Sequence, residues 1–312
     1  MAAGSSKKVI FAALAGNFLI ALTKFGAALW TGSSAMLSEG VHSLVDTGNQ
    51  CLLLYGHHRA NRPPDEQHPL GFGRELYFWS FIVALLVFSL GAGVSLYEGI
   101  AHILDPHPIT DPVVNYAVIA FSVVFEGISW RMALQEFRKT KGDLNYFQAF
   151  KRSKNAPLFL VLFEDTAALI GLAIACAGNF ASHYFNRFEL DGVASLGISL
   201  VLAVTATMLA RESKELLLGE PAAARVTNSI MEIARQQDGV ERINGLMTVH
   251  LAPDEIVLAL SLEFADPLNT PGIEQRIAAL ERKLRSAHPE LITIFIKPQA
   301  REQFRQFSHH GP

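Results

Sequence analysis

The chain has 312 residues, of which 50% are hydrophobic and 18% charged, and its mean hydropathy is +0.25. This balance excludes an intrinsically disordered chain, which needs low hydrophobicity and high net charge. The 2 cysteines exclude a disulfide-built scaffold and a zinc site made from cysteines. A net charge of −3 gives no overall attraction to nucleic acid, so we expect no nucleic-acid partner. The composition favours a protein that lies partly in a lipid bilayer.

Long apolar segments recur along the first two thirds of the chain. A helix needs about 20 residues to cross the hydrocarbon core of a bilayer. Segments of this length predict a multi-pass bundle of six transmembrane helices, and the first is too long for a cleavable signal peptide. The expected spans are Val9–Leu29, Met36–Tyr55, Leu76–Tyr97, Val113–Phe137, Pro157–Asn186 and Gly192–Ala210.

The positive charges of the connecting loops predict the orientation of this bundle. Lys and Arg residues gather before the first span, between the second and third spans, and between the fourth and fifth. The remaining connections carry only Arg187. Because cytoplasmic loops are enriched in Lys and Arg, we expect both termini in the cytoplasm. The simplest host is a bacterial inner membrane.

The composition changes after residue 218. Over 255–264 the large apolar residues recur at every second position, with smaller or polar residues between them, which is the periodicity of a strand, and Thr270-Pro271 is typical of a helix start. The residues expected on one face are Ile256, Leu258, Leu260, Leu262 and Phe264, and those on the other are Val257, Ala259, Ser261 and Glu263. We therefore expect a transmembrane domain at 1–218, a cytoplasmic α+β domain with a ferredoxin-like αββαβ order at 219–300, and a polar, frayed tail at 301–312. The expected elements of the α+β domain are a helix at 222–237, strands at 246–251 and 255–264, a helix at 270–287 and a strand at 291–297.

The second predicted span carries a stripe of polar residues. An ionisable group within a membrane helix costs about 3 kcal/mol, so such groups are retained for function or are paired. At 100° per residue the stripe covers an arc of roughly 100°, which places it toward the interior of the bundle. His42 and Asp46 are four residues apart and can converge on one cation. The stripe consists of Glu39, His42, Asp46, Asn49 and Gln50.

The fifth predicted span carries two adjacent acids, Glu164 and Asp165. Neighbouring helix positions point about 100° apart, so the two carboxylates do not face one ion symmetrically. We expect Asp165 to be a ligand, while Glu164 is either a further ligand or a group that tunes its neighbour. A neutral imidazole with carboxylates suits Zn, Co, Fe, Mn or Cd.

Two further ionisable residues have readings that the sequence leaves open. Lys24 in the first span either reaches the far membrane interface or counters Glu126 inside the bundle. Asp191 is expected to cap the sixth span with its carboxylate, with a place on the ion's entry path as the alternative.

Two of these motifs resemble those of a known family. The run Ser38–Asp46 resembles the second-helix motif of the cation diffusion facilitator family of divalent metal/proton antiporters, and Glu164–Ala168 resembles its fifth-helix motif. The likeness is strongest to the branch that contains zinc transporter nine. It implies a homodimer in which His42, Asp46 and Asp165 form the transport site of each protomer.

The chain departs from the family pattern in three places. Val161 stands where the fifth-helix motif usually has a histidine, so the fourth ligand is Glu164, Glu39 or water. The C-terminal domain has no His/Asp cluster, and we expect it to serve in dimerisation.

The third departure lies in the loop between the second and third spans. Asp65 and His68 match the family's metal-binding loop, but Phe72 stands where a second histidine is common. This leaves open either a loop metal site or a solvated pair.

The function that these observations predict is export of a divalent metal from the cytoplasm in exchange for protons, by alternating access. Zinc is the first expectation, and Fe, Co, Mn and Cd remain open because the missing histidine leaves an oxygen-rich site. The metal is cargo, and no resident cofactor is expected. The alternative is a membrane-embedded metal sensor or scaffold that does not transport. No His-Glu-x-x-His helix, phosphate-binding loop or Gly-x-Ser-x-Gly turn occurs, so we do not expect an enzyme.

Overall fold

The computed structural model of the chain describes residues 2–109, 111–141, 145–146 and 156–307. The chain divides into two compact units, residues 1–59 with 75–214, and residues 60–74 with 215–312. Residues 60–74, which are predicted to be a loop of the transmembrane domain, belong in the structure to the same unit as the C-terminal residues. The loop cations Lys151, Arg152 and Lys154 lie outside the described residues.

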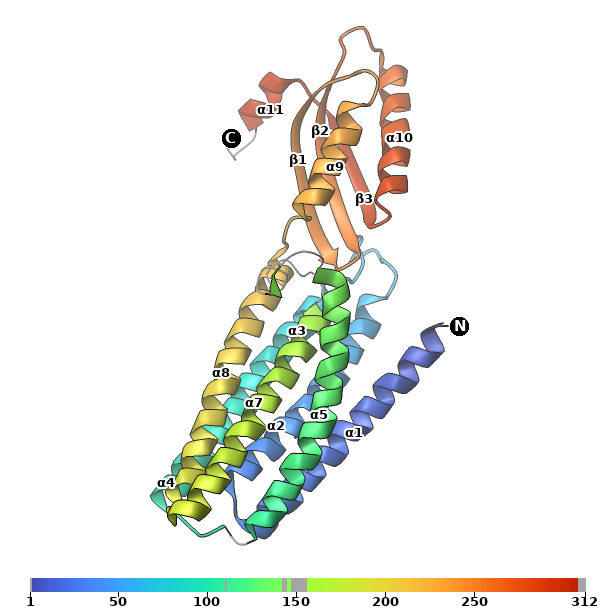
Figure 1. The fold of residues 1–312 in the computed structure, drawn as a ribbon. Helices are drawn as coiled ribbons and strands as arrows, with labels where there is room; N and C mark the ends of the chain where they lie inside the picture. Colours follow the sequence, from blue (N-terminus) through green and yellow to red (C-terminus); the bar gives the residue numbers. More distant parts are fainter. Residues whose placement is uncertain (1, 110, 142–144, 147–155, 308–312) are drawn as a thin grey trace. The chain divides into compact units, whose positions relative to one another are not determined.

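The first unit is built from long helices that run side by side (Figure 1). A single uninterrupted helical run, Glu75–Leu104, consists of α3, the π-helix η1 and α4. The elements are α1 (Ala2–Thr31), α2 (Ser34–Ala60), α3 (Glu75–Leu86), η1 (Val87–Ala92), α4 (Gly93–Leu104), α5 (Pro112–Lys141), α7 (Ala156–Phe185) and α8 (Glu189–Leu218).

Within the described residues, 4 helical stretches are long and apolar enough to cross a membrane. The helices α1 and α2 are not among them. The polar stripe of α2 lowers its mean hydropathy, and the side chains of residues 1–13 in α1 are not described. The chain is thus a mostly helical membrane protein, and the count of six spans remains a prediction. The stretches are Glu75–Leu104, Val113–Arg138, Leu158–Phe185 and Glu189–Leu218.

Small residues let α4 and α8 approach closely. A Cβ added to Gly99 would lie 2.9 Å from the carbonyl oxygen of Gly192 and 2.8 Å from Leu196 Cδ2. In membranes such small residues are the usual means of close helix packing, because lipid leaves no hydrophobic driving force between helices. A side chain at either glycine would therefore separate α4 from α8.

The π-helix η1 replaces one α-helical segment in the middle of a stretch long enough to cross a membrane. A π-turn uses hydrogen bonds from residue i to i+5, which widen the helix and disturb the regular ladder. Ser199 on α8 donates a hydrogen bond of 2.8 Å from its hydroxyl to the carbonyl oxygen of Ala92, at the end of η1. This contact supplies a donor to the irregular turn from a neighbouring helix.

The second unit contains a three-stranded sheet in the order β1-β2-β3. Strand β1 pairs antiparallel with β2, and β2 pairs parallel with β3. The predicted order of helix, two strands, helix and strand is confirmed. The elements are α9 (Ala224–Arg235), β1 (Val240–Ala252), β2 (Glu255–Phe264), α10 (Thr270–Ala287) and β3 (Leu291–Pro298).

The core of this unit lies between the sheet and the two helices α9 and α10. Of the alternate residues of β2 that were expected to share a face, Phe264 is partly buried and the other four are buried: Ile256, Leu258, Leu260 and Leu262. Ile230 of α9 and Leu280 and Leu284 of α10 pack against them. Helix α10 begins after Asn269, whose side chain accepts a hydrogen bond of 3.0 Å from the amide of Gly272.

The expectation of a frayed tail is wrong for residues 301–307. These residues form helix α11 (Arg301–Phe307). The aromatic ring of Phe304 covers Gly245, since a Cβ on that glycine would lie 2.5 Å from Phe304 Cζ. This apolar contact, together with the hydrogen bond of 3.2 Å from the Arg301 amide to Glu263 Oε1, holds a segment whose polar composition gave no signal for a helix.

Candidate functional site

The polar stripe of α2 faces the interior of the helix bundle, as its spacing predicts. Glu39, His42, Asp46 and Asn49 are all buried, with exposed fractions of 0%, 1%, 7% and 0%. Because these side chains follow a helical period, a single helix brings all of them to one interior face. The stripe therefore provides several polar groups in a region from which water is largely excluded.

His42 and Asp46 form the closest pair of candidate ligands. His42 Nδ1 lies 3.5 Å from Asp46 Oδ1, as the i,i+4 spacing predicts. Neither ring nitrogen of His42 nor Asp46 Oδ1 makes a hydrogen bond within the part of the chain that the structure describes. Most buried polar atoms in proteins have such a partner. A neutral imidazole has a free electron pair on one of its two nitrogens, so that nitrogen and Asp46 Oδ1 are unsatisfied electron-pair donors of the kind that a cation can use.

The two acids of α7 point to different neighbours. Glu164 Oε1 accepts a hydrogen bond of 2.9 Å from Asn49 Nδ2, and Asp165 Oδ2 accepts one of 2.8 Å from the Ser129 hydroxyl of α5. This divergence follows from the 100° between adjacent helix positions. Both acids are buried and interact electrostatically with Asp46.

The structure therefore brings the predicted ligands into one region without assembling them. Among the described residues, no group of three or more His, Cys, Asp or Glu side chains is arranged to hold a metal ion. His42 and Asp46 form a near pair, while Glu164 and Asp165 are each held by a hydrogen-bond donor. Sequence reasoning included Asn49 in the stripe but assigned it no role, and it missed Ser129. The signal in the sequence that could have indicated Ser129 is its position three residues after Glu126, which places both side chains on one face of the same predicted helix.

Lys24 does not reach a membrane interface. Its side chain is fully buried, and its Nζ lies 3.0 Å from Glu39 Oε2 and 3.8 Å from Glu126 Oε1. It also donates a hydrogen bond of 2.7 Å to the Ser43 hydroxyl. Of the two alternatives, the contact with Glu126 inside the bundle is correct, but the shortest ion pair is with Glu39.

Asp191 caps a different helix from the one expected. Its carboxylate accepts hydrogen bonds from Ser33 Oγ at 2.9 and 3.1 Å, from Ser34 Oγ at 3.0 Å and from the amide of Ala35 at 3.1 Å. These donors lie at the N-terminus of α2, whereas Asp191 lies in the first turn of α8. A carboxylate at this place satisfies free amide groups and opposes the positive end of the helix dipole. Asp191 thus anchors the helix that carries the polar stripe.

The loop pair Asp65 and His68 forms a local turn. Asp65 Oδ1 accepts hydrogen bonds from the backbone amides of Gln67 and His68 and lies 3.0 Å from His68 Nδ1. Desolvation raises the pKa of Asp65, but these hydrogen bonds and the nearby His68 ring outweigh it, so the pKa lies below its ordinary value. The side chains are about half exposed, 51% and 50%. Phe72 packs on His68 with ring centroids 4.4 Å apart, so it fills the place of the family's second histidine with an apolar contact.

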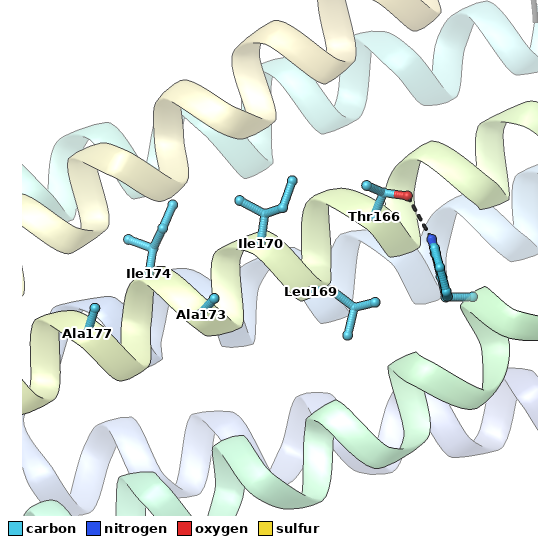
Figure 2. A pocket seen from close by; sticks show the side chains of 7 residues that line it. Thr166, Leu169, Ile170, Ala173, Ile174 and Ala177 are labelled. Carbon is cyan, nitrogen blue, oxygen red and sulfur yellow. Dashed lines mark hydrogen bonds between the residues drawn. The ribbon is translucent and has the colours of Figure 1, made fainter. Parts of the chain in front are cut away.

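A groove of about 450 Å³ lies along α7 but contains none of the candidate ligands (Figure 2). Its polar contact is the hydrogen bond of 3.0 Å from Trp130 Nε1 to the Thr166 hydroxyl. An apolar lining of this kind in a membrane helix does not suit a metal ion. The lining residues are Trp130, Thr166, Leu169, Ile170, Ala173, Ile174 and Ala177.

Comparison with known proteins supports the same family as the motifs. Residues 10–218 match the family description "Cation efflux transmembrane domain". The chain belongs to the cation diffusion facilitator family. The match covers both the α2 stripe and the α7 acids, and the family consists of transporters, so the expectation that the chain is not an enzyme is confirmed.

Several curated proteins are similar to this family member. The mitochondrial proton-coupled zinc antiporter SLC30A9 of Homo sapiens is 31% identical over 260 residues, which cover 82% of this chain and 46% of the relative. Metal tolerance protein C4 of Arabidopsis thaliana is 28% identical over 262 residues, covering 83% and 57%. The cation-efflux pump FieF of Escherichia coli is 24% identical over 267 residues, covering 84% and 82%. The chain thus spans about half the length of the antiporters it matches.

Proposed function

We propose that the chain is a secondary transporter that exports a divalent metal from the cytoplasm in exchange for protons, with zinc as the first candidate. Membership of the cation efflux family supports the transport of a cation. The similarity to a protein named as a proton-coupled zinc antiporter supports zinc and protons as the exchanged ions. Fe, Co, Mn and Cd remain candidates because Val161 gives α7 no imidazole four residues before Asp165.

The observation that carries this proposal is the unsatisfied pair on α2. His42 presents two ring nitrogens without hydrogen-bond partners beside an Asp46 oxygen that also has none, within the described residues. We assign His42, Asp46 and Asp165 as ligands and Glu164 as a fourth. Asn49 and Ser129 then hold the α7 acids when metal is absent, and exchange of these hydrogen bonds for the cation accompanies loading.

Proton coupling follows from the chemistry of the same atoms. A ring nitrogen or carboxylate that holds a proton cannot use that electron pair for a metal, so metal and protons compete for one set of groups. In the proposed cycle cytoplasmic metal displaces protons, the bundle opens to the other side, and external protons release the metal. The proposal includes six membrane spans, cytoplasmic termini, a homodimer and a bacterial inner membrane.

The assignment is tested by metal flux into proteoliposomes that contain the full chain. We expect Asp46→Asn to abolish zinc uptake, because the amide keeps the side-chain shape but loses the charge that balances the cation. Asp105→Asn removes a carboxylate at an exposed position and should leave uptake unchanged. Uptake that survives Asp46→Asn and ignores a pH gradient would exclude this mechanism.

A binding measurement does not separate transport from a metal sensor or scaffold, whereas flux does. If the purified chain binds zinc but moves none under either direction of the pH gradient, the sensor alternative replaces the transporter. The loop pair Asp65 and His68 is tested in the same assay, since a loop metal site predicts a higher KM for His68→Ala and a solvated turn predicts no change.

A further inference from the structure

Lys24 is the one fully buried lysine or arginine among the side chains that the structure describes. Its ammonium lies where α1, α2 and α5 meet, within 3.0 Å of Glu39 Oε2 and 3.8 Å of Glu126 Oε1. The third contact, a hydrogen bond of 2.7 Å to the Ser43 hydroxyl, directs the ammonium to the helix that carries the polar stripe. One cation is therefore shared between two buried carboxylates.

Both carboxylates border the proposed metal site. Glu39 lies on the buried face of α2, three residues before His42. Its second oxygen, Oε1, has no hydrogen-bond partner within the described residues and lies against Gly171 of α7, where a Cβ would collide with it. It thus stands between the same two helices that supply the candidate ligands.

Glu126 approaches the site from α5. It interacts electrostatically with Asp46 and with Asp165, one on each side of the proposed site. Its exposed fraction is 4%, so water screens these interactions little. Without Lys24, both acids would be buried carboxylates with free oxygens close to a doubly charged ion.

The paired state excludes these acids from the metal. A buried ammonium without a partner is as unfavourable as a buried carboxylate without one. A divalent ion that took Glu39 would leave the ammonium uncompensated and would also approach a positive charge. Keeping Lys24 paired with Glu39 and Glu126 avoids both of these costs.

We propose that Lys24 is a positioning residue that decides which carboxylates the transported metal meets. It reserves Glu39 and Glu126, and so leaves the metal to the acids beside His42. The inference rests on the proposed metal site and adds that the ammonium of Lys24 keeps two carboxylates from binding the metal, which affects which metal the site selects.

Metal selectivity is the property that this device would control. Additional carboxylates make a site harder and richer in oxygen, which favours Mn²⁺ relative to Zn²⁺. Loss of the ammonium should therefore raise the ratio of Mn²⁺ to Zn²⁺ uptake (kcat/KM for each ion), by about tenfold, a 1.4 kcal/mol difference. A purely structural ion pair would lower both rates together and leave the ratio unchanged.

A stepwise series in proteoliposomes tests this. Lys24→Gln frees both acids, the double variant with Glu39→Gln removes one of them, and the triple variant with Glu126→Gln removes both. We expect the Mn²⁺/Zn²⁺ ratio to rise in the single variant and to return in steps to the wild-type value. Lys24→Arg keeps the charge and should keep the wild-type ratio.

The double and triple variants remove carboxylates together with the ammonium, so they leave fewer uncompensated charges buried than the single variant does. The test therefore does not depend on folding of the single variant. The inference is overturned if the double and triple variants have the same Mn²⁺/Zn²⁺ uptake ratio and any Lys24→Gln single variant that folds keeps the wild-type ratio. If the wild-type chain moves neither ion, the proposed function fails instead. If wild-type transport is lost on Asp46→Asn but the Lys24 series leaves the ratio constant, the site stands and the selectivity role of Lys24 is wrong.

Discussion

Replacing Asp191 by alanine is expected to loosen the start of α2. The wild-type carboxylate accepts hydrogen bonds from Ser33, Ser34 and the backbone amide of Ala35, all in a fully buried setting. The serine hydroxyls can rotate, and Ser34 already lies 3.0 Å from the Ser195 hydroxyl. The amide of Ala35 cannot rotate and is left without an acceptor.

The expected loss of stability can be estimated from these contacts. A buried amide without an acceptor costs about 1–3 kcal/mol. Removing a negative charge from a helix N-terminus costs about 0.3–1 kcal/mol, and up to about 2 kcal/mol in a buried setting. We therefore expect Asp191→Ala to lower the free energy of unfolding by roughly 2–4 kcal/mol. In a unit of about this size 1 kcal/mol corresponds to about 2–4 °C, so the thermal midpoint should fall by roughly 5–15 °C.

The assay is the fraction of detergent-solubilised full chain that stays monodisperse after heating. Asp191→Asn keeps the side-chain volume and one oxygen acceptor, so its midpoint should lie between wild type and alanine. Glu189→Ala removes an acid from the same first turn of α8 and serves as the matched control. An alanine variant within about 2 °C of wild type, or an asparagine variant below the alanine variant, would refute the capping role.

Three further predictions use the same heating assay. Desolvation first, and the charge of Asp254 second, raise the pKa of Glu255 above 4.5. The protonated carboxyl therefore favours the folded state, and this contribution is lost as the pH rises through the raised pKa and the carboxylate forms. Glu255→Gln should raise the thermal midpoint at neutral pH and leave it unchanged below pH 4.5. Gly171→Ala should cost about 1–3 kcal/mol, because its Cβ would collide with Glu39 Oε1 while the ion pair of Glu39 Oε2 with Lys24 keeps that side chain from moving aside, whereas Gly127→Ala, with no atom within 4 Å of its added Cβ, should not destabilise. Gly99→Ala should destabilise similarly, since its Cβ would lie 2.9 Å from a backbone oxygen of α8. A midpoint equal to wild type for Gly171→Ala or for Gly99→Ala contradicts the packing described.

Local periodicity made much of this structure predictable. The polar stripe of α2 follows a helical period and its ionisable members avoid lipid, so its buried position follows from spacing alone. Strand β2 spans Glu255–Phe264 as the two-residue period of its large apolar side chains predicts, and helix α10 spans the predicted Thr270–Ala287. In each case the signal lies within one segment and needs no knowledge of its neighbours.

The features that the sequence did not predict depend on contacts between segments. The partner of Asp191 is the end of another helix, and the choice of Glu39 over the interface for Lys24 depends on how α1 and α2 pack. Helix α11 packs through the ring of Phe304, which contacts Gly245 of β1, a residue far away in the sequence. For the candidate site, spacing placed His42 beside Asp46, whereas the donors Asn49 and Ser129 on the α7 acids required the helix packing.

The π-helix η1 also determines which residues of α4 face α8. A wide turn of this kind accommodates one extra residue, and each residue rotates the following helix by about 100°. If Val87–Ala92 became regular α-helix with no residue removed, the extra residue would rotate everything after Ala92 by about 100° and turn Gly99 away from its crossing with α8. Changes that favour regular α-helix in this turn would therefore alter the surface that all of α4 presents, whereas deleting one residue here would remove the wide turn and leave that surface nearly unchanged.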